Sequence, residues 1–162
     1  MPDPRRTTVE TPLGPFSVVV GDAGVITTTF GVEPRDVERR DRALADVRRE
    51  VAAYFRGRLR RFETPVDLSS VGEGFVRRAL EVVRTVPYGE LWTYGDVAAA
   101  AGSARGGRAA GSALARCPIE LFVPCHRIVR AGPDLGSYGG HEDRRRFLLE
   151  LEGAVPGRSR GA

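Results

Sequence analysis

The stretch Phe122-Val123-Pro124-Cys125-His126-Arg127-Ile128-Val129 places a cysteine beside a histidine and an arginine inside an apolar run. A thiol becomes a nucleophile when a neighbouring group takes its proton and positive charge favours the thiolate, and His126 and Arg127 can do both. A lone cysteine in an apolar run is usually an inert core residue. Burying two polar groups beside it for packing alone would be costly, so the stretch indicates an activated nucleophile.

Composition restricts the class of protein. The 162 residues suit one compact unit or two small subdomains. No apolar run approaches membrane-spanning length, and the N-terminus lacks a signal-peptide core, which predicts a cytoplasmic protein without a membrane partner. Two cysteines and two histidines argue against a disulfide scaffold and a His-rich metal site. The net charge of +4 favours a polyanionic partner without identifying one.

The N-terminal half reads as strands followed by a helix. Residues 8–31 are rich in β-branched residues and turn signals, which predicts strands over residues 16–20 and 25–30, paired as a hairpin. Residues 32–40 are polar and predict an exposed connection. Apolar residues at a spacing of four predict an amphipathic helix over residues 41–62, whose arginines at 56, 58, 60 and 61 form either its solvated face or a DNA contact. Residues 64–70 predict an extended join.

The next segment predicts a helix–turn–helix. A helix over residues 73–86 precedes a short helix that starts near Thr93 or Tyr94 and runs to Ala101, a turn at Gly102-Ser103, and a second helix from Arg105 to Arg116. This second helix has almost no side-chain bulk, and each interior glycine costs it about 1 kcal/mol relative to alanine. Close packing against another helix and close approach to a DNA groove both explain small residues, and the pattern does not decide between them. Arg108 projects from this helix as a candidate for insertion into a duplex.

The chain then passes through the Cys125 stretch and glycine-rich loops around 132–140 to a last helix over residues 142–152. Phe147, Leu148 and Leu151 are expected to face the core, and Glu152 lies at the helix end. His141 reads as a solvated loop residue without a role. Tyr88, Trp92 and Phe75 read as core aromatics. The Gly/Arg/Pro-rich tail, residues 154–162, predicts disorder.

Five segments in order resemble one known family: Val86-Pro87-Tyr88-Gly89-Glu90, Thr93-Tyr94, Gly107-Arg108-Ala109-Ala110-Gly111, Pro124-Cys125-His126-Arg127-Ile128-Val129 and Tyr138-Gly139-Gly140. Together they look like the O6-alkylguanine-DNA alkyltransferases, also called methylated-DNA–protein-cysteine methyltransferases. The resemblance is dense over residues 73–153 and thinner before them.

The resemblance implies a two-part architecture. An N-terminal ribonuclease-H-like α/β domain, residues 1–70 with its linker, is followed by a C-terminal winged-helix-like domain, residues 71–153, that carries the active site. The helix–turn–helix is expected to engage the minor groove of duplex DNA, with DNA contacts from Arg108, Tyr94, Gly95, Ser103 and Arg127. Arg108 matches the family's arginine finger, which fills the space that a flipped nucleotide leaves.

The resemblance also implies a mechanism. Cys125 accepts the alkyl group from O6-alkylguanine, and perhaps from O4-alkylthymine, once and irreversibly, without a cofactor. His126 is the expected base, acting through a water because neighbouring side chains on an extended strand point apart, and Glu152 orients it. Tyr94 donates a proton toward the guanine ring. Tyr138, Gly139 and Val129 line the substrate pocket. Taken alone, Glu152 would read as a surface acid and Tyr94 as a core or cap residue.

The sequence departs from the family at one important position. An Asn usually precedes the proline that leads into the active-site strand, and Cys117 stands there in this chain. A thiol cannot reproduce an amide's two donors and its acceptor, so the turn must be held differently. The family's usual Phe-Gln pair and a later aromatic appear here as Phe75-Val76 and Leu80. The N-terminal zinc ligands of some relatives have no counterpart, so no metal is expected, and the protein is expected to be a monomer.

Two other functions stay open. Alkyltransferase-like proteins bind lesions without transferring the alkyl group and usually carry Trp at the nucleophile's position, so Cys125 argues against that class, while Cys117 keeps it open. A helix–turn–helix regulator with a redox-sensitive thiol is the third reading. It is disfavoured because the small-residue helix has few side chains that could read base edges.

Overall fold

The computed structural model describes residues 4–31, 41–103, 106–132 and 135–154. The chain forms two compact units: unit 1 is Met1–Ser70 with Pro118–Phe122, and unit 2 is Val71–Cys117 with Val123–Ala162. The sequence assigns residues 118–122 to the C-terminal domain, but here they cluster with unit 1. Four predicted segments lie at least partly outside the described residues: the connection over 32–40, Arg105 at the start of the second helix of the motif, part of the loop around 133, and the tail from 155.

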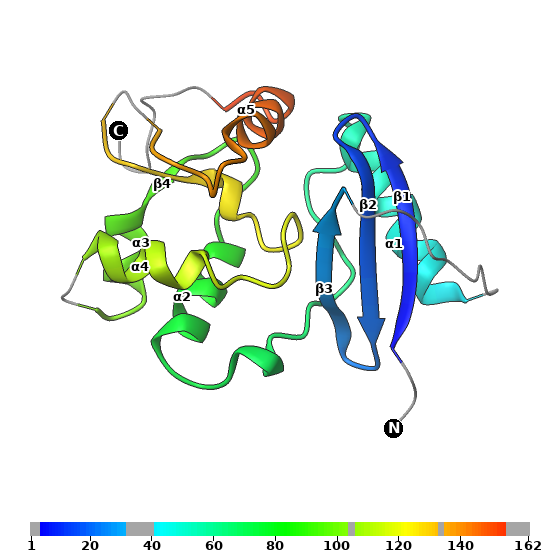
Figure 1. Cartoon of the computed structure of the whole chain (residues 1–162), viewed down its shortest axis with the longest axis horizontal. Coiled ribbons are helices and arrows are strands. Elements are labelled where there is room, and N and C mark those ends of the chain that lie inside the picture. The colour runs from blue at the N-terminus through cyan, green and yellow to red at the C-terminus, as the bar shows by residue number, and fades with distance from the viewer. Residues whose placement is uncertain (1–3, 32–40, 104–105, 133–134, 155–162) are drawn as a thin grey trace. The chain divides into compact units, whose positions relative to one another are not determined.

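Unit 1 contains an antiparallel sheet of three strands in the order β1-β2-β3 (Figure 1), formed by β1 (Arg5–Thr11), β2 (Gly14–Gly21) and β3 (Gly24–Phe30). The predicted hairpin is confirmed, because β2 and β3 pair from Phe16 opposite Phe30 to Gly21 opposite Gly24. The turn requires glycine at position 24, where φ is +132° and a Cβ would collide with the Pro65 carbonyl. β1 begins earlier than the β structure that the sequence predicts.

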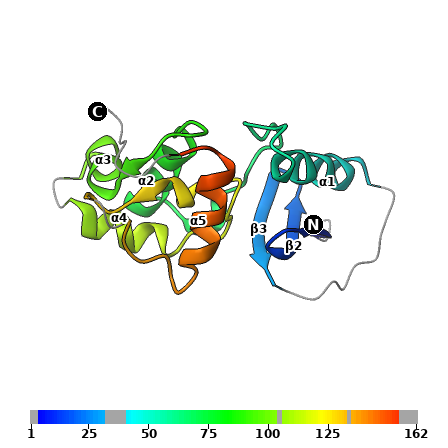
Figure 2. The same cartoon turned by 90° about the horizontal axis from the view of Figure 1, so that it is seen from above.

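Helix α1 (Arg42–Phe55) lies across one face of this sheet (Figure 2) and buries Leu44, Val47, Val51 and Tyr54. The prediction of a helix to residue 62 was wrong. The helix ends because Gly57 adopts φ +72°, and the Arg58 N–H donates to the Ala53 carbonyl at 2.9 Å. Phe62 fits the apolar spacing of the predicted helix although it lies beyond the helix end. It is apolar because its ring packs against that of Tyr54, with ring centroids 5.4 Å apart.

The Pro118–Phe122 segment is held on β3. The Pro118 carbonyl accepts hydrogen bonds from the Thr28 N–H at 3.0 Å and the Thr27 hydroxyl at 2.9 Å. The Thr28 hydroxyl donates to the Glu120 carbonyl at 2.9 Å, and the Phe122 ring lies 4.4 Å from that of Phe62. These contacts anchor the chain immediately after Cys117, where the sequence predicts that a thiol alone could not hold the turn.

Unit 2 carries the predicted helix–turn–helix. The 3₁₀ turn η1 (Ser69–Val71) lies at the boundary between the two units. Unit 2 then continues with α2 (Phe75–Arg84), α3 (Tyr94–Ala100), a turn at Gly102-Ser103 and α4 (Gly107–Leu114). Both helices of the motif are confirmed, although the second is shorter than the sequence predicts. Helix α5 (Glu142–Leu151) agrees with the predicted last helix (Figure 1). Its buried leucines are Leu148 and Leu149, whereas Phe147 and Leu151 are only half-buried, so the expected core face was partly wrong.

The small residues of α4 serve close packing. Ala110 and Ala113 are fully buried where α4 packs on α2 and α3. A Cβ on Gly107 would lie 3.3 Å from the Tyr94 Cβ, and one on Gly111 would lie 4.0 Å from Tyr94 Cδ1. Helix packing therefore explains the small residues on the inner face of α4, one of the two explanations that the sequence left open. Arg108 and Ser112 face solvent.

Candidate active site

Cys125 lies on a short 3₁₀ turn, η2 (Cys125–Arg127), which leads into strand β5 (Ile128–Val129). The expectation of an extended strand at Cys125 and His126 was therefore wrong: the strand begins only at Ile128. Pro124 starts the turn, and the Arg127 N–H donates to the Pro124 carbonyl at 3.0 Å. In a 3₁₀ turn, successive side chains diverge by about 120° instead of pointing to opposite faces. Every residue from Leu121 to Val129 is buried, and Cys125 is 6% exposed.

A second strand fixes this turn to the helix–turn–helix. β4 (Trp92–Thr93) pairs in parallel with β5, so that Thr93 lies opposite Val129. Thr93 also begins α3 with a capping box: its hydroxyl accepts from the Asp96 N–H at 3.1 Å, and the Asp96 carboxylate accepts from the Thr93 N–H at 2.9 Å. The first residue of α3, Tyr94, is thereby fixed close to the Cys125 turn.

His126 and Glu152 form a buried pair. The His126 Nε2 lies 2.7 Å from the Glu152 Oε2, and both side chains are completely excluded from solvent. The two residues come from η2 and from the end of α5, far apart in the sequence. The structure thus brings together two of the residues that the sequence assigns to catalysis.

Arg127 binds the same carboxylate. Its Nε donates to Glu152 Oε1 at 2.8 Å and its Nη2 to Glu152 Oε2 at 3.0 Å, a bidentate ion pair. The remaining Nη1 donates to the Val86 carbonyl at 2.7 Å, and the guanidinium lies 5.7 Å from the centre of the Tyr88 ring. Arg127 is 7% exposed, so it lies in the interior of unit 2, although the sequence assigned it to DNA contact.

These cations decide the charge of Glu152. Burial by itself raises the pKa of this carboxyl group, but the hydrogen bonds and charges of His126 and then Arg127 outweigh burial and hold the pKa well below its usual value. Glu152 is therefore ionised near neutral pH and able to stabilise a charged imidazole.

The segment after α2 encloses this network, a role that sequence reasoning missed. The Tyr88 hydroxyl donates to the Leu151 carbonyl at 3.3 Å, and the Gly89 N–H points at Glu152 Oε1 at 3.5 Å. Tyr88 was expected to be a core aromatic, yet it is half-buried. The available signal was the position of Val86-Pro87-Tyr88-Gly89-Glu90 among the family motifs.

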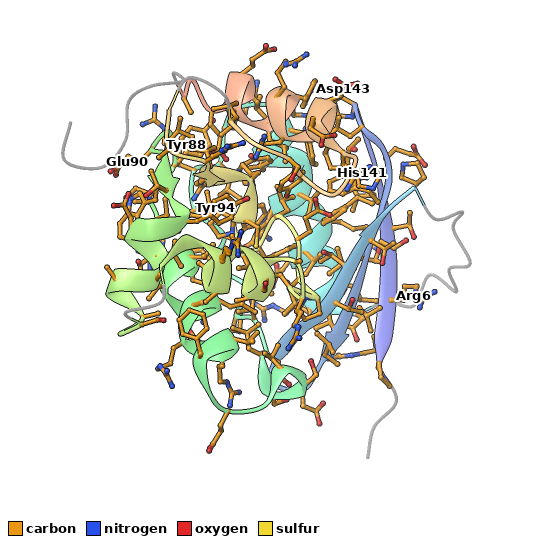
Figure 3. All side chains as sticks on the ribbon, turned by 60° about the vertical axis from the view of Figure 1, so that its left-hand side comes forward. Arg6, Tyr88, Glu90, Tyr94, His141 and Asp143 are labelled. Carbon is orange, nitrogen blue, oxygen red and sulfur yellow. The ribbon has the colours of Figure 1, made fainter. Side chains whose placement is uncertain are left out.

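Tyr94 is half-buried, and Figure 3 shows it over the middle of unit 2, whereas Glu90 lies at the edge. Burial raises the pKa of Tyr94; the positive charge of Arg145 opposes the rise, and Cys125 adds to it. Both groups are therefore near enough to act on the phenol electrostatically.

The three expected pocket residues differ in exposure. Val129 is buried, Tyr138 is half-buried, and Gly139 is exposed with φ +56°. The Tyr138 N–H donates to Glu142 Oε1 at 3.2 Å, and the Tyr138 carbonyl accepts from the His141 N–H at 2.8 Å. These bonds join the loop to the start of α5. His141 is exposed, at the edge of the loop.

Sequence reasoning also missed Arg145, a buried arginine on α5 that contacts the Tyr138 loop. From the sequence it is given no role. Its position nevertheless predicts burial, because Leu148 and Leu149 follow it at spacings of three and four on the same face of the helix.

The expected DNA-binding residues on the helix–turn–helix are accessible to different degrees. Arg108 and Gly95 are exposed and Ser103 is half-buried. Cys117 is also half-buried, and its N–H donates to the Leu114 carbonyl at 3.1 Å.

Two family models match the chain. The ribonuclease-like domain of 6-O-methylguanine DNA methyltransferase matches residues 5–68, and the DNA binding domain of 6-O-methylguanine DNA methyltransferase matches residues 74–154. The chain belongs to the 6-O-methylguanine DNA methyltransferase family. The expected fold class, an α/β ribonuclease-like domain followed by a helical DNA-binding domain, is thereby confirmed.

Individual relatives cover nearly the whole chain. A methylated-DNA–protein-cysteine methyltransferase of Mycolicibacterium paratuberculosis is 35% identical over 90% of each chain. A DNA base-flipping protein of Thermus thermophilus is 37% identical over 90% of this chain and 97% of its own. The crystal structure of Mycobacterium tuberculosis OGT in complex with DNA superposes with a TM-score of 0.79 at 33% identity, covering 91% of this chain and 92% of its own.

Two further observations bear on the expectations for a metal and a membrane. Within the described ranges, no group of three or more His, Cys, Asp or Glu residues could hold a metal ion. No helix in the described part of the chain has the length and hydropathy needed to cross a bilayer.

Proposed function

We propose that this protein repairs DNA by moving the alkyl group of O6-alkylguanine in duplex DNA onto Cys125 in a single, irreversible turnover. The observation that carries the proposal is the buried turn on which Cys125 adjoins His126, which is itself bound to the Glu152 carboxylate. A histidine oriented by a buried carboxylate is the arrangement that activates a thiol or hydroxyl nucleophile.

The thiol proton goes to His126. Because Nε2 points at Glu152, the imidazole takes this proton at Nδ1, directly or through a water molecule. The resulting imidazolium is stabilised by the Glu152 carboxylate, whose negative charge Arg127 maintains. This network assigns Arg127 a positioning role in place of DNA contact.

The thiolate then attacks the alkyl carbon. The new C–S bond forms as the C–O6 bond breaks, and guanine leaves with the electron pair. Tyr94 donates a proton to the departing base, and water returns a proton to Tyr94 and removes one from His126, so the proton count balances. The thioether has no good leaving group, so Cys125 is not regenerated.

The damaged base must leave the duplex to reach a buried thiol, at a cost of a few kcal/mol. The exposed Arg108 on α4 fills the vacated space in this proposal, with Gly95 and Ser103 beside the DNA backbone. Tyr138, Gly139 and Val129 form the pocket for the flipped base.

The test is transfer of label from duplex DNA containing O6-[³H-methyl]guanine to the protein. Wild type is expected to take up label in stoichiometric amount and Cys125→Ser none. Cys117→Ser is the matched control, because it removes the other thiol and should still accept the label. Label that persists in Cys125→Ser, or no transfer by wild type, would contradict the proposal.

A relative named as a DNA base-flipping protein keeps a second function in view, namely lesion binding without transfer. Tight binding of the methylated duplex by wild type with no covalent product would establish that function. Sequence-specific binding to undamaged DNA would instead support the regulator reading.

A further inference from the structure

Arg145 is a buried cation whose purpose the proposed transfer does not explain. It is 2% exposed. Backbone hydrogen bonds lower the pKa of Glu142, and the positive charge of Arg145 lowers it further, so this acid at the start of α5 is within electrostatic reach of the guanidinium. Burying a guanidinium is costly unless its N–H groups are also paired, so its hydrogen bonds must compensate. Those contacts all lead to one loop.

The guanidinium holds consecutive residues of that loop. Its Nη2 donates to the Gly136 carbonyl and its Nη1 approaches the Ser137 carbonyl at 3.5 Å. Its Cζ lies 5.4 Å from the centre of the Tyr138 ring, within the range of a cation–π contact. One rigid side chain therefore fixes both the backbone and the aromatic ring of the segment expected to line the base pocket.

The same loop has little freedom at its start. Gly136 has φ +82°, and a Cβ there would lie 2.9 Å from the Cβ of Arg130, whose N–H donates to the Leu135 carbonyl at 2.9 Å. The Gly136–Tyr138 segment is thus closed at one end by Arg130 and held along its length by Arg145.

Arg145 also acts on Tyr94. Its positive charge opposes the rise in the Tyr94 pKa that burial causes, while Cys125 acts in the other direction. A phenol that gives up a proton becomes an anion, and a neighbouring guanidinium stabilises that anion. The Arg145 Nε is buried and makes no hydrogen bond to any described group, so the side chain is not fully engaged by the loop.

We propose that Arg145 is a positioning residue of the alkylguanine pocket: it fixes the Gly136–Tyr138 segment as a wall for the flipped base. The inference rests on the proposed alkyl transfer and adds a residue on which base recognition depends. Alkyl transfer then has two separate requirements. His126 and Glu152 activate the thiol, and Arg145 shapes the pocket that binds the flipped base.

The experiment compares two reactions of the same thiol. Transfer from free O6-benzylguanine needs the base pocket, whereas alkylation of Cys125 by iodoacetamide does not. Arg145→Met is expected to slow benzyl transfer by about 10- to 100-fold, because a loosened wall misplaces the base, and to leave the iodoacetamide rate unchanged. Arg146→Met is the matched control: the same change one residue along, at an exposed position, should alter neither rate.

Arg145→Lys keeps a positive charge but cannot hold both carbonyls, so benzyl transfer should fall less than in Arg145→Met. Thermal unfolding shows whether each variant is folded. If Arg145→Met is not, the benzyl-transfer rate of Arg145→Lys tests the inference. Unchanged benzyl transfer in the folded variants, or equal losses in both reactions, would overturn the inference. If wild type transfers neither benzyl nor methyl groups, the proposed function fails, and the inference fails with it.

Discussion

Glu152 accepts hydrogen bonds from His126 and Arg127 at once, with its Oε2 2.7 Å from the His126 Nε2 and its Oε1 2.8 Å from the Arg127 Nε. One carboxylate therefore joins the expected base to a buried cation. We expect these three side chains to affect both the reactivity of the Cys125 thiol and the stability of unit 2.

Replacing Glu152 with Gln is expected to lower the free energy of unfolding by about 3–5 kcal/mol, because Arg127 stays buried without its counter-ion. The rate of methyl transfer should also fall, since His126 loses the group that orients it. Chemical denaturation and single-turnover kinetics measure the two effects. Glu150→Gln, an exposed change on the same helix, is the control and should leave both near wild type. Wild-type stability in Glu152→Gln would show that the ion pair is not important.

The depressed pKa of Glu152 predicts a pH-dependent stability. A carboxyl group whose pKa is lower in the folded state stabilises the fold above its ordinary value of 4.5, and this contribution is lost as the pH falls below that value. The stability difference between wild type and Glu152→Gln should therefore be constant near neutral pH and shrink in acid. Denaturation curves from pH 7 to pH 3 measure it. A difference that stays constant to pH 3 would contradict the assignment.

Substitutions at Arg127 and Arg108 should have opposite effects, because Arg127 is buried and Arg108 is proposed to face DNA. Arg127→Lys is expected to destabilise the protein, because lysine cannot make the bidentate pair, and to leave DNA affinity unchanged. Arg108→Ala should leave stability unchanged, weaken duplex binding and slow transfer from duplex DNA but not from free O6-benzylguanine. Thermal unfolding and binding at several salt concentrations measure both. Weaker duplex binding by Arg127→Lys together with wild-type stability would return that residue to DNA contact.

Gly107 and Gly111 offer a matched pair of glycine-to-alanine changes on α4. Alanine at 111 would meet Tyr94 only at van der Waals distance, 4.0 Å, so it should raise stability by up to about 1 kcal/mol through helix propensity. Alanine at 107 would press on the Tyr94 Cβ at 3.3 Å, so part of that gain should be lost and benzyl transfer should slow. Thermal unfolding and transfer rates for both variants test this. Equal transfer by the two would show that α4 does not position Tyr94.

The predictions that succeeded rest on local patterns. A high content of β-branched residues between turn signals predicted the β2–β3 hairpin, and a short helix starting near Thr93 or Tyr94 with a turn at Gly102-Ser103 predicted the helix–turn–helix. The helix over 41–62 failed because apolar spacing continued through a turn that Gly57 makes, and Phe62 is apolar for a contact with Tyr54. Spacing alone cannot distinguish a longer helix from a chain that folds back on the same face.

By itself the sequence predicted Cys125 as the nucleophile, His126 as its neighbouring base and, through the resemblance, a carboxylate at Glu152. Only the tertiary structure decided that Cys125 lies on a 3₁₀ turn, that Arg127 is buried against Glu152, and that Arg145 holds the Tyr138 loop. The reason is physical: residue types and local periodicity record what a segment can do, whereas the burial of a charge depends on partners that the fold brings from distant parts of the chain.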